Sequence, residues 1–155
     1  MQMLNDLLRK AVNLSIENIF KEIFSMRDIQ TFVIERNRLR LQKGENTDGS
    51  KIKNTITGKD NYSYSTQQIY AKIGRRIMAG SNYTMKYSGD FYNSINIQNI
   101  NENYFEIDAD PIKSNGTNLF KTYGDFLIGA SDEDFELLRE KVLPLVNEKL
   151  RNQFF

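Results

Sequence analysis

The 155-residue chain contains no cysteine and no histidine. The absence of cysteine excludes disulfide bonds and thiolate chemistry, and the absence of histidine excludes imidazole acid–base catalysis. Zinc sites built on either residue type are excluded for the same reason. Any catalysis would therefore have to depend on carboxylates, lysine, tyrosine or serine.

Long apolar stretches are also missing from the sequence, since the longest apolar run is only a few residues. The first residues, MQMLND, lack the basic region and the continuous apolar core of a signal peptide. We therefore expect a soluble protein that is made in a cytoplasm and does not enter a membrane. The length predicts a single domain over residues 1–155.

Charge is distributed unevenly along the chain, although the net charge is only +1. Residues 1–86 contain 15 Lys and Arg against 8 Asp and Glu, whereas residues 87–155 contain 6 against 12. One interpretation is that the basic and acidic stretches neutralise each other within one folded molecule. The other is that faces of opposite sign meet between neighbouring copies, which favours head-to-tail association into a ring.

The first part of the chain predicts two helices. Apolar residues at helical spacing indicate a helix over residues 3–25, with its apolar stripe packed in the core. Asp28 can cap a second helix that ends near residue 43. We expect Arg36, Arg38 and Arg40 on its exposed side, where they form the best candidate for nucleic-acid contact in the chain.

Residues 44–64 are rich in glycine, asparagine, serine and threonine and contain only two aliphatic residues. The composition predicts a polar loop, and loops of this length in a compact domain are typical of functional segments such as a contact arm onto another subunit. Ser65 then caps a predicted helix over residues 66–78, which carries Arg75 and Arg76 on its polar side.

The second half of the chain predicts a hairpin and a final helix. Residues 95–109 alternate between apolar and polar side chains, which indicates an antiparallel β-hairpin. Ser131 and the acidic residues after it are typical of a helix start. The expected fold class is α+β, with long N-terminal and C-terminal helices packed on a small antiparallel sheet whose central hairpin is residues 95–109.

Glu106, Asp108 and Asp110 project from one face of the predicted second strand, with Lys113 nearby. Carboxylates in this arrangement can hold Mg²⁺, as they do in many nucleases. The pattern fits poorly, because Lys113 follows Asp110 through a proline instead of lying on the same strand face. We therefore expect no metal, no cofactor and no catalytic residue here. The acidic strand is interpreted as a solvated face or as a contact surface for the basic face of a neighbouring copy.

Three short segments of the sequence are the most informative. Residues 39–52 (LRLQKGENTDGSKI) predict a helix that stops at a glycine, followed by an Asp-Gly turn. Residues 87–95 (YSGDFYNSI) predict entry into a short helix with one buried side. The third segment joins residues 105–110 (FEIDAD) to residues 123–129 (YGDFLIG).

In this order and at this spacing, the segments resemble the small neck, head-to-tail connector and tail-completion proteins of tailed bacteriophages, most closely those of crAss-like and related phages. The resemblance covers about residues 36–145. In that family a helix ends in glycine before a D-G turn, a G-[DE]-F segment precedes a β-hairpin, and a Y-G-x-x-[IL]-[IL]-G segment precedes a C-terminal helix. This chain departs from the pattern at residues 62–65, where YSYS stands in place of a proline-containing Y-S-P-like segment.

The resemblance implies a non-catalytic structural subunit of the virion neck or tail, assembled in the host cytoplasm. It also implies a ring-shaped homo-oligomer that contacts portal-side or tail-side virion proteins and lies close to the genomic DNA. With the resemblance, the uneven charge favours an interface between faces of opposite sign. The expected interface residues are Arg36, Arg38, Arg40, Arg75, Arg76, Glu106, Asp108 and Asp110.

Three other functions stay open from the residues alone. The main alternative is a nucleic-acid-binding module that uses the arginine, lysine and tyrosine side chains of residues 36–76. A metal-dependent nuclease would use the acidic strand, and a small regulator directed at the host is the remaining class.

Overall fold

The structure is a computed structural model that describes residues 2–86, 88–101 and 104–154, with the backbone alone at positions 2–4, 6–8, 10, 13–15, 153 and 154. Its elements follow the chain in an α+β arrangement. They are α1 (Gln2–Phe24), α2 (Arg27–Lys43), α3 (Tyr64–Lys72), α4 (Asp90–Ser94), β1 (Asn96–Gln98), β2 (Glu106–Asp108), α5 (Leu119–Tyr123), a 3₁₀ turn η1 (Asp125–Leu127) and α6 (Asp132–Phe154).

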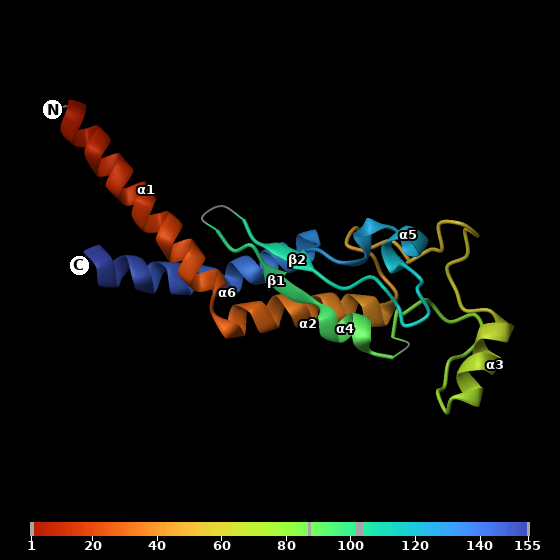
Figure 1. Ribbon diagram of the computed structural model, residues 1–155. Coiled ribbons are helices and arrows are strands. Elements are labelled where there is room, and N and C mark those ends of the chain that lie inside the picture. Colours follow the sequence, from red (N-terminus) through yellow and green to blue (C-terminus); the bar gives the residue numbers. More distant parts are fainter. Residues whose placement is uncertain (1, 87, 102–103, 155) are drawn as a thin grey trace.

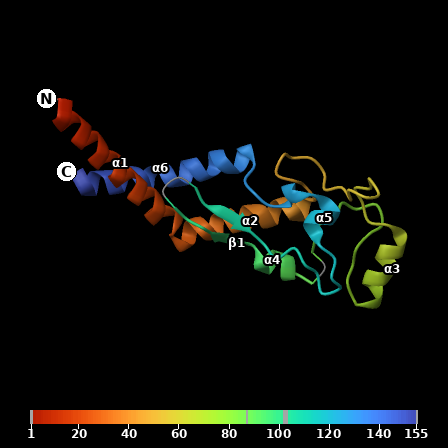
Figure 2. The same cartoon turned by 45° about the horizontal axis from the view of Figure 1, so that its top comes forward.

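The molecule is elongated, and its two ends are built from different elements (Figures 1 and 2). The free ends of α1 and α6 lie at one end, and α3 lies at the other. Between them, α2 runs beside α6 and the β1–β2 hairpin. One core is shared by the end of α1, the start of α2, α6 and the apolar face of the hairpin. This packing agrees with the predicted α+β fold. This core contains Ile19, Ile23, Phe24, Ile29, Val33 and Leu138.

The predicted apolar stripe of α1 is buried only near the end of the helix. Ile23 is fully buried, whereas Val12 and Ile16 are 41% and 46% exposed. The prediction of core packing is therefore wrong for these two residues, because α1 extends beyond the body of the molecule (Figure 1). The predictions for Leu4 and Leu7 fall on side chains outside the described residues.

The predicted hairpin is present, with β1 and β2 paired so that Ile97 lies opposite Ile107. Both isoleucines pack against the core formed with α1 and α6. This side-chain pattern confirms the alternation expected over residues 95–109, since neighbouring residues in a strand point to opposite faces. The turn that such a hairpin requires, expected at residues 101–103, lies partly outside the described residues.

A second core lies at the other end of α2 and joins all three informative segments of the sequence. Leu41, Ile52 and Leu127 are fully buried there, with Phe91 and Ile95 almost so. These residues come from parts of the chain that are far apart in sequence. The segments that carry the phage resemblance therefore pack against one another.

The segment predicted as a polar contact arm, residues 44–64, is attached to the body over much of its length. Ile52 inserts into the second core, which contributes about 1.5–3 kcal/mol of burial free energy. The Thr55 backbone N–H donates to the Thr122 carbonyl at 2.8 Å, and the Thr47 N–H donates to the Phe126 carbonyl at 2.9 Å. The predicted loop is present, since no helix or strand lies in the described stretch between Lys43 and Tyr64, and these contacts hold it against the body.

The projecting segment is residues 61–80, which we call the arm. An isolated bridge between Asn61 and Asn82 closes the base of the arm. Its helix, α3, begins two residues earlier than predicted because Ser63, not Ser65, accepts the capping hydrogen bond from the Thr66 N–H. The same helix ends at Lys72 instead of continuing to residue 78.

Of the three boundary signals predicted for α2 and α6, the cap at Asp28 is wrong, and the stop at Gly44 and the cap at Ser131 are confirmed. Asp28 lies in the first turn of α2 but does not cap it, because the capping position is occupied by Met26. Gly44 ends α2 in the left-handed conformation, with a φ of 77°. At the start of α6, the Ser131 hydroxyl accepts a hydrogen bond from the Asp134 N–H at 3.1 Å, as predicted.

No helix among the described residues is both long enough and apolar enough to span a bilayer.

Gly44 is held by its surroundings as well as by its backbone conformation. A Cβ at this position would lie 2.5 Å from Asn82 Cβ and 2.9 Å from the Tyr83 carbonyl oxygen. Gly58 provides a matched control, since its φ is +69° but nothing lies within 4 Å of the equivalent position.

We expect Gly44→Ala to lower the free energy of unfolding by about 2 kcal/mol more than Gly58→Ala, because both pay the left-handed backbone strain but only Gly44→Ala adds a steric clash. Urea denaturation of the two variants beside the unmodified protein measures the difference. Equal losses in the two variants would contradict this account of the α2 terminus.

Candidate functional site

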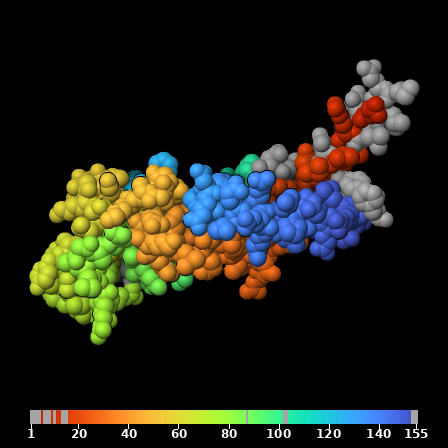
Figure 3. Space-filling view, turned by 180° about the vertical axis from the view of Figure 1, so that it is seen from behind, coloured from red at the N-terminus to blue at the C-terminus, as the bar shows by residue number. Residues whose placement is uncertain are grey.

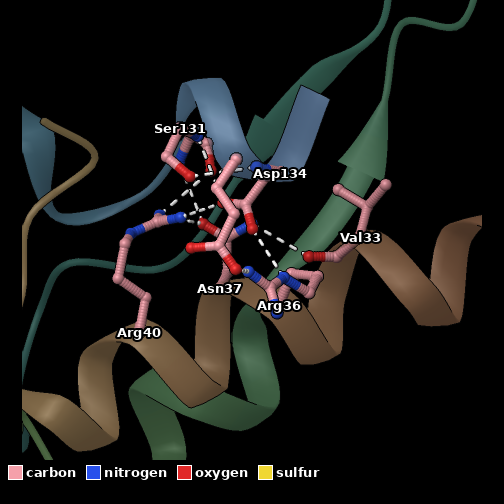
Figure 4. Close-up of polar contacts among 8 residues, drawn as sticks. Val33, Arg36, Asn37, Arg40, Ser131 and Asp134 are labelled. Atoms are coloured by element: carbon pink, nitrogen blue, oxygen red, sulfur yellow. Dashed lines mark hydrogen bonds and ion pairs between the residues drawn. The ribbon is translucent and has the colours of Figure 1, made fainter. Parts of the chain in front are cut away.

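A buried polar cluster joins α2 to the start of α6 (Figure 4). The Asp134 carboxylate accepts hydrogen bonds from Arg36 Nε at 2.6 Å and from Arg40 Nη1 at 2.5 Å. Arg36 also donates to Glu133 at 2.9 Å. These pairs join residues separated by more than ninety positions in the sequence. The cluster therefore positions the first turn of α6 over the middle of α2.

Asn37 completes the cluster from the centre of α2, where its side chain is only 1% exposed. Its side-chain nitrogen donates to the Val33 carbonyl, and its oxygen accepts from both Arg40 Nη2 and the Gly129 N–H at 2.8 and 2.9 Å. Arg40 Nη2 also donates to the Gly129 carbonyl at 3.0 Å. The turn before α6 is thus bonded to α2 through both the N–H and the carbonyl of Gly129.

The charges in this cluster affect one another's pKa values. Burial alone would raise the pKa of Asp134, but hydrogen bonds from Arg36 and Ser131 and the charge of Arg40 outweigh it, so the pKa is lowered. The hydrogen bond to Asp134 is the main cause of a raised pKa at Arg36. Burial lowers the pKa of Arg40, although an arginine remains charged under any ordinary condition.

The three arginines predicted to be exposed on α2 all make contacts within the chain. Arg40 is 7% exposed, and the side chain of Arg36 is 23% exposed. Arg38 Nε donates to the Tyr92 carbonyl at 3.0 Å, and its Nη1 pairs with Glu35 at 2.6 Å. The prediction that these arginines are exposed is wrong: Arg40 is buried, and Arg36 and Arg38 are only partly exposed. Each of them finds its hydrogen-bonding partner within its own chain.

Arg75 and Arg76 are brought to a different place, on the arm beyond the end of α3. Both are exposed. They follow Gly74, whose φ of +71° helps to turn the chain after the helix. The structure therefore does not join Arg75 and Arg76 to the α2 arginines in one basic surface.

The three tyrosines considered for nucleic-acid contact differ in their exposure. Tyr62 and Tyr70 are each 7% exposed and pack against each other with ring centroids 5.9 Å apart. Only Tyr64, which is 67% exposed, presents its ring to the surroundings. Stacking with bases requires exposed rings, so the structure leaves one of the three available.

Each acidic residue in and just after the hairpin accepts a hydrogen bond from a different partner within the chain. Asp108 accepts a hydrogen bond from Gln98 at 2.8 Å, Glu106 accepts one from Asn99, and Asp110 accepts one from the Ile112 N–H at 2.9 Å. Asp110 lies beyond the end of β2, so it does not share the strand face as predicted. No group of three or more acidic side chains among the described residues is placed to hold a metal ion.

The structure also contains a cleft that the sequence analysis did not identify, which we call the α2–α6 cleft. It has a volume of 510 Å³ and lies between the end of α2, the turn at residues 45–49 and the start of α6. Two of its lining residues, Leu39 and Phe126, are apolar and 47% and 65% exposed. Sequence spacing carries no signal for it, because its walls come from two segments, residues 36–49 and 126–134, that are far apart in the chain.

A second concave surface is an apolar groove of 540 Å³ between the end of α1, the hairpin and α6. Phe135 and Tyr104 line it and are 56% and 51% exposed.

The chain matches no protein-family model, no curated protein and no solved structure. The likeness to phage neck and tail proteins therefore depends on the three sequence segments described above.

We expect Asp134→Asn to lower the free energy of unfolding by about 3 kcal/mol at neutral pH, because it removes the charge that compensates the buried Arg40. The exposed neighbour Asp132 provides the control, and Asp132→Asn should change stability by less than about 0.5 kcal/mol. Chemical denaturation of both variants and of the unmodified protein gives these values.

The difference in unfolding free energy between the unmodified protein and Asp134→Asn should depend on pH. The pKa of Asp134 is lower in the folded state than the unfolded value of about 3.9, so its contribution is complete above that value and is lost as the pH falls through the folded-state pKa. The stability difference between the unmodified protein and Asp134→Asn should therefore narrow below about pH 4. A difference that stays constant under acid would contradict the role given to this carboxylate.

Proposed function

We propose that the chain is a non-catalytic structural subunit of a tailed-phage neck or tail, one copy in a ring of a head-to-tail connector or tail-completion protein. The proposal is supported by the three sequence segments, which pack together in the second core. It places the protein in the virion, in contact with other copies and with portal-side or tail-side virion proteins.

The observation that carries the proposal is the apolar exposure of the arm. Ile69, Ile73 and Met78 are 56%, 49% and 76% exposed, although the arm buries Tyr62 and Tyr70 on its inner side. Exposed apolar groups gathered on one projecting segment are typical of a surface that another protein covers. A subunit interface in a ring would bury them.

A nucleic-acid-binding module is the second candidate, and the composition of the arm favours it. Residues 61–80 contain Lys72, Arg75 and Arg76 and no acidic residue. Tyr64 is exposed at the start of α3, and the cations lie at its end and beyond it, so the arm offers both charge and a ring for stacking. Binding to DNA that weakens steeply with added salt, in a protein that stays monomeric, would favour this function over the ring subunit.

We expect the purified chain to form a discrete oligomer, and Met78→Asp to reduce its mass because a carboxylate cannot be buried in an apolar contact. Ile56→Asp is the matched control, since Ile56 is 82% exposed but lies outside the arm. Size-exclusion chromatography with light scattering measures the mass, and negative-stain microscopy shows whether a ring forms. A monomer over about a hundredfold range of concentration would refute the ring subunit.

We also expect no nuclease turnover with Mg²⁺ or Mn²⁺, because Glu106, Asp108 and Asp110 each have a separate partner. Incubation with labelled single-stranded and double-stranded DNA provides the measurement. Turnover that Asp108→Asn abolishes and Asp125→Asn leaves intact would overturn the non-catalytic proposal.

A further inference from the structure

We infer that the α2–α6 cleft is the docking site for the arm of a second copy of this chain. The inference rests on the proposed function and adds to it the two surfaces that meet. It follows from the charge, the apolar exposure and the placement of the cleft and the arm.

The cleft is more acidic than basic. Among the described residues, five acidic side chains and three basic ones line it. Arg36 and Arg40 are already engaged by Asp134 and Glu133 in the buried cluster. At the rim, the exposed Asp48 and Asp132 and the partly exposed Glu45 outnumber the one exposed cation, Lys43. A basic partner is therefore favoured over an acidic one.

The walls of the cleft are held in place by contacts within the chain. The Thr47 N–H donates to the Phe126 carbonyl, and a Cβ at Gly129 would lie 3.0 Å from Thr47 Cγ2. On the other side, Asp134 is bound by both arginines of α2. The cleft is thus preformed, so a ligand does not have to order it on binding.

The arm has the complementary properties. Its three cations, Lys72, Arg75 and Arg76, are exposed and no acidic residue lies among them. Ile73 and Met78 are exposed within the same short stretch. In the cleft, Leu39 and Phe126 provide exposed apolar surface beside the acidic rim. An apolar centre with charged surroundings on both partners is the usual composition of a specific interface.

The placement of the two surfaces makes the contact heterologous. The arm forms one end of the elongated molecule, whereas the start of α6 lies against the end of α2 on the face shown in Figure 3. Because the arm and the cleft are different surfaces, each copy can donate its arm to one neighbour and accept an arm from another. Repetition of such a contact gives a closed ring when the rotation permits and a filament when it does not.

Disulfide trapping tests the contact directly, since the chain has no cysteine of its own. One protein carries Ile73→Cys on the arm, and a second, distinguished by a size tag, carries Asp48→Cys at the cleft. After mixing under mild oxidation, we expect about tenfold more mixed dimer than with Glu140→Cys as the control, because docking raises the effective concentration of the two thiols. Glu140 is exposed on α6 and does not line the cleft.

The outcomes separate the inference from the proposed function. Equal trapping by Asp48→Cys and Glu140→Cys, in a protein that light scattering shows to be oligomeric, would overturn the arm–cleft contact and leave the ring subunit standing. A protein that is monomeric and shows no trapping would refute both.

A charge exchange gives a second, independent measurement. We expect Arg75→Glu with Arg76→Glu, or Asp48→Lys with Asp132→Lys, to weaken association about tenfold, and a mixture of the two double variants to restore it between unlike copies. Circular dichroism and thermal melting confirm that each variant is folded. Association that is unchanged in both double variants, with no response to salt, would overturn the inference.

Discussion

The fold depends on one buried ion pair, between Arg40 of α2 and Asp134 in the first turn of α6. Each side chain is less than 10% exposed, so neither charge is stabilised by water and each requires the other. Asn37 and the backbone of Gly129 occupy the remaining hydrogen-bonding positions around Arg40 Nη2. The direction of α6, the turn that precedes it and one wall of the α2–α6 cleft are all set by this contact.

The same pair changes the interpretation of the uneven charge along the chain. Part of the basic excess in the first half is neutralised by acidic residues of the second half within one molecule, through Arg36 and Arg40. Among the charges that are left exposed, those of the arm are all basic, and those at the rim of the cleft are more acidic than basic. Complementarity between copies is therefore proposed for a smaller set of residues than the sequence alone indicates.

Part of the exposed apolar surface lies in the same two places. Small single domains bury most of their large apolar side chains, and scattered exceptions are ordinary. Here Ile69, Ile73 and Met78 gather on a segment that projects from the body, and Leu39 and Phe126 gather at the cleft. Together these features support a protein whose surface is completed by neighbouring copies, as a structural ring subunit requires.

The sequence by itself determined the α+β class, the alternating hairpin within residues 95–109, and the capping of α6 by Ser131. These features depend on local periodicity and capping, which neighbouring residues specify. Only the tertiary structure decided that Arg36 and Arg40 are internal, that Ile52 anchors the polar loop, and that the arm is residues 61–80. Each of these depends on contacts between distant segments, and no local pattern shows which distant partner a charged or apolar side chain will meet.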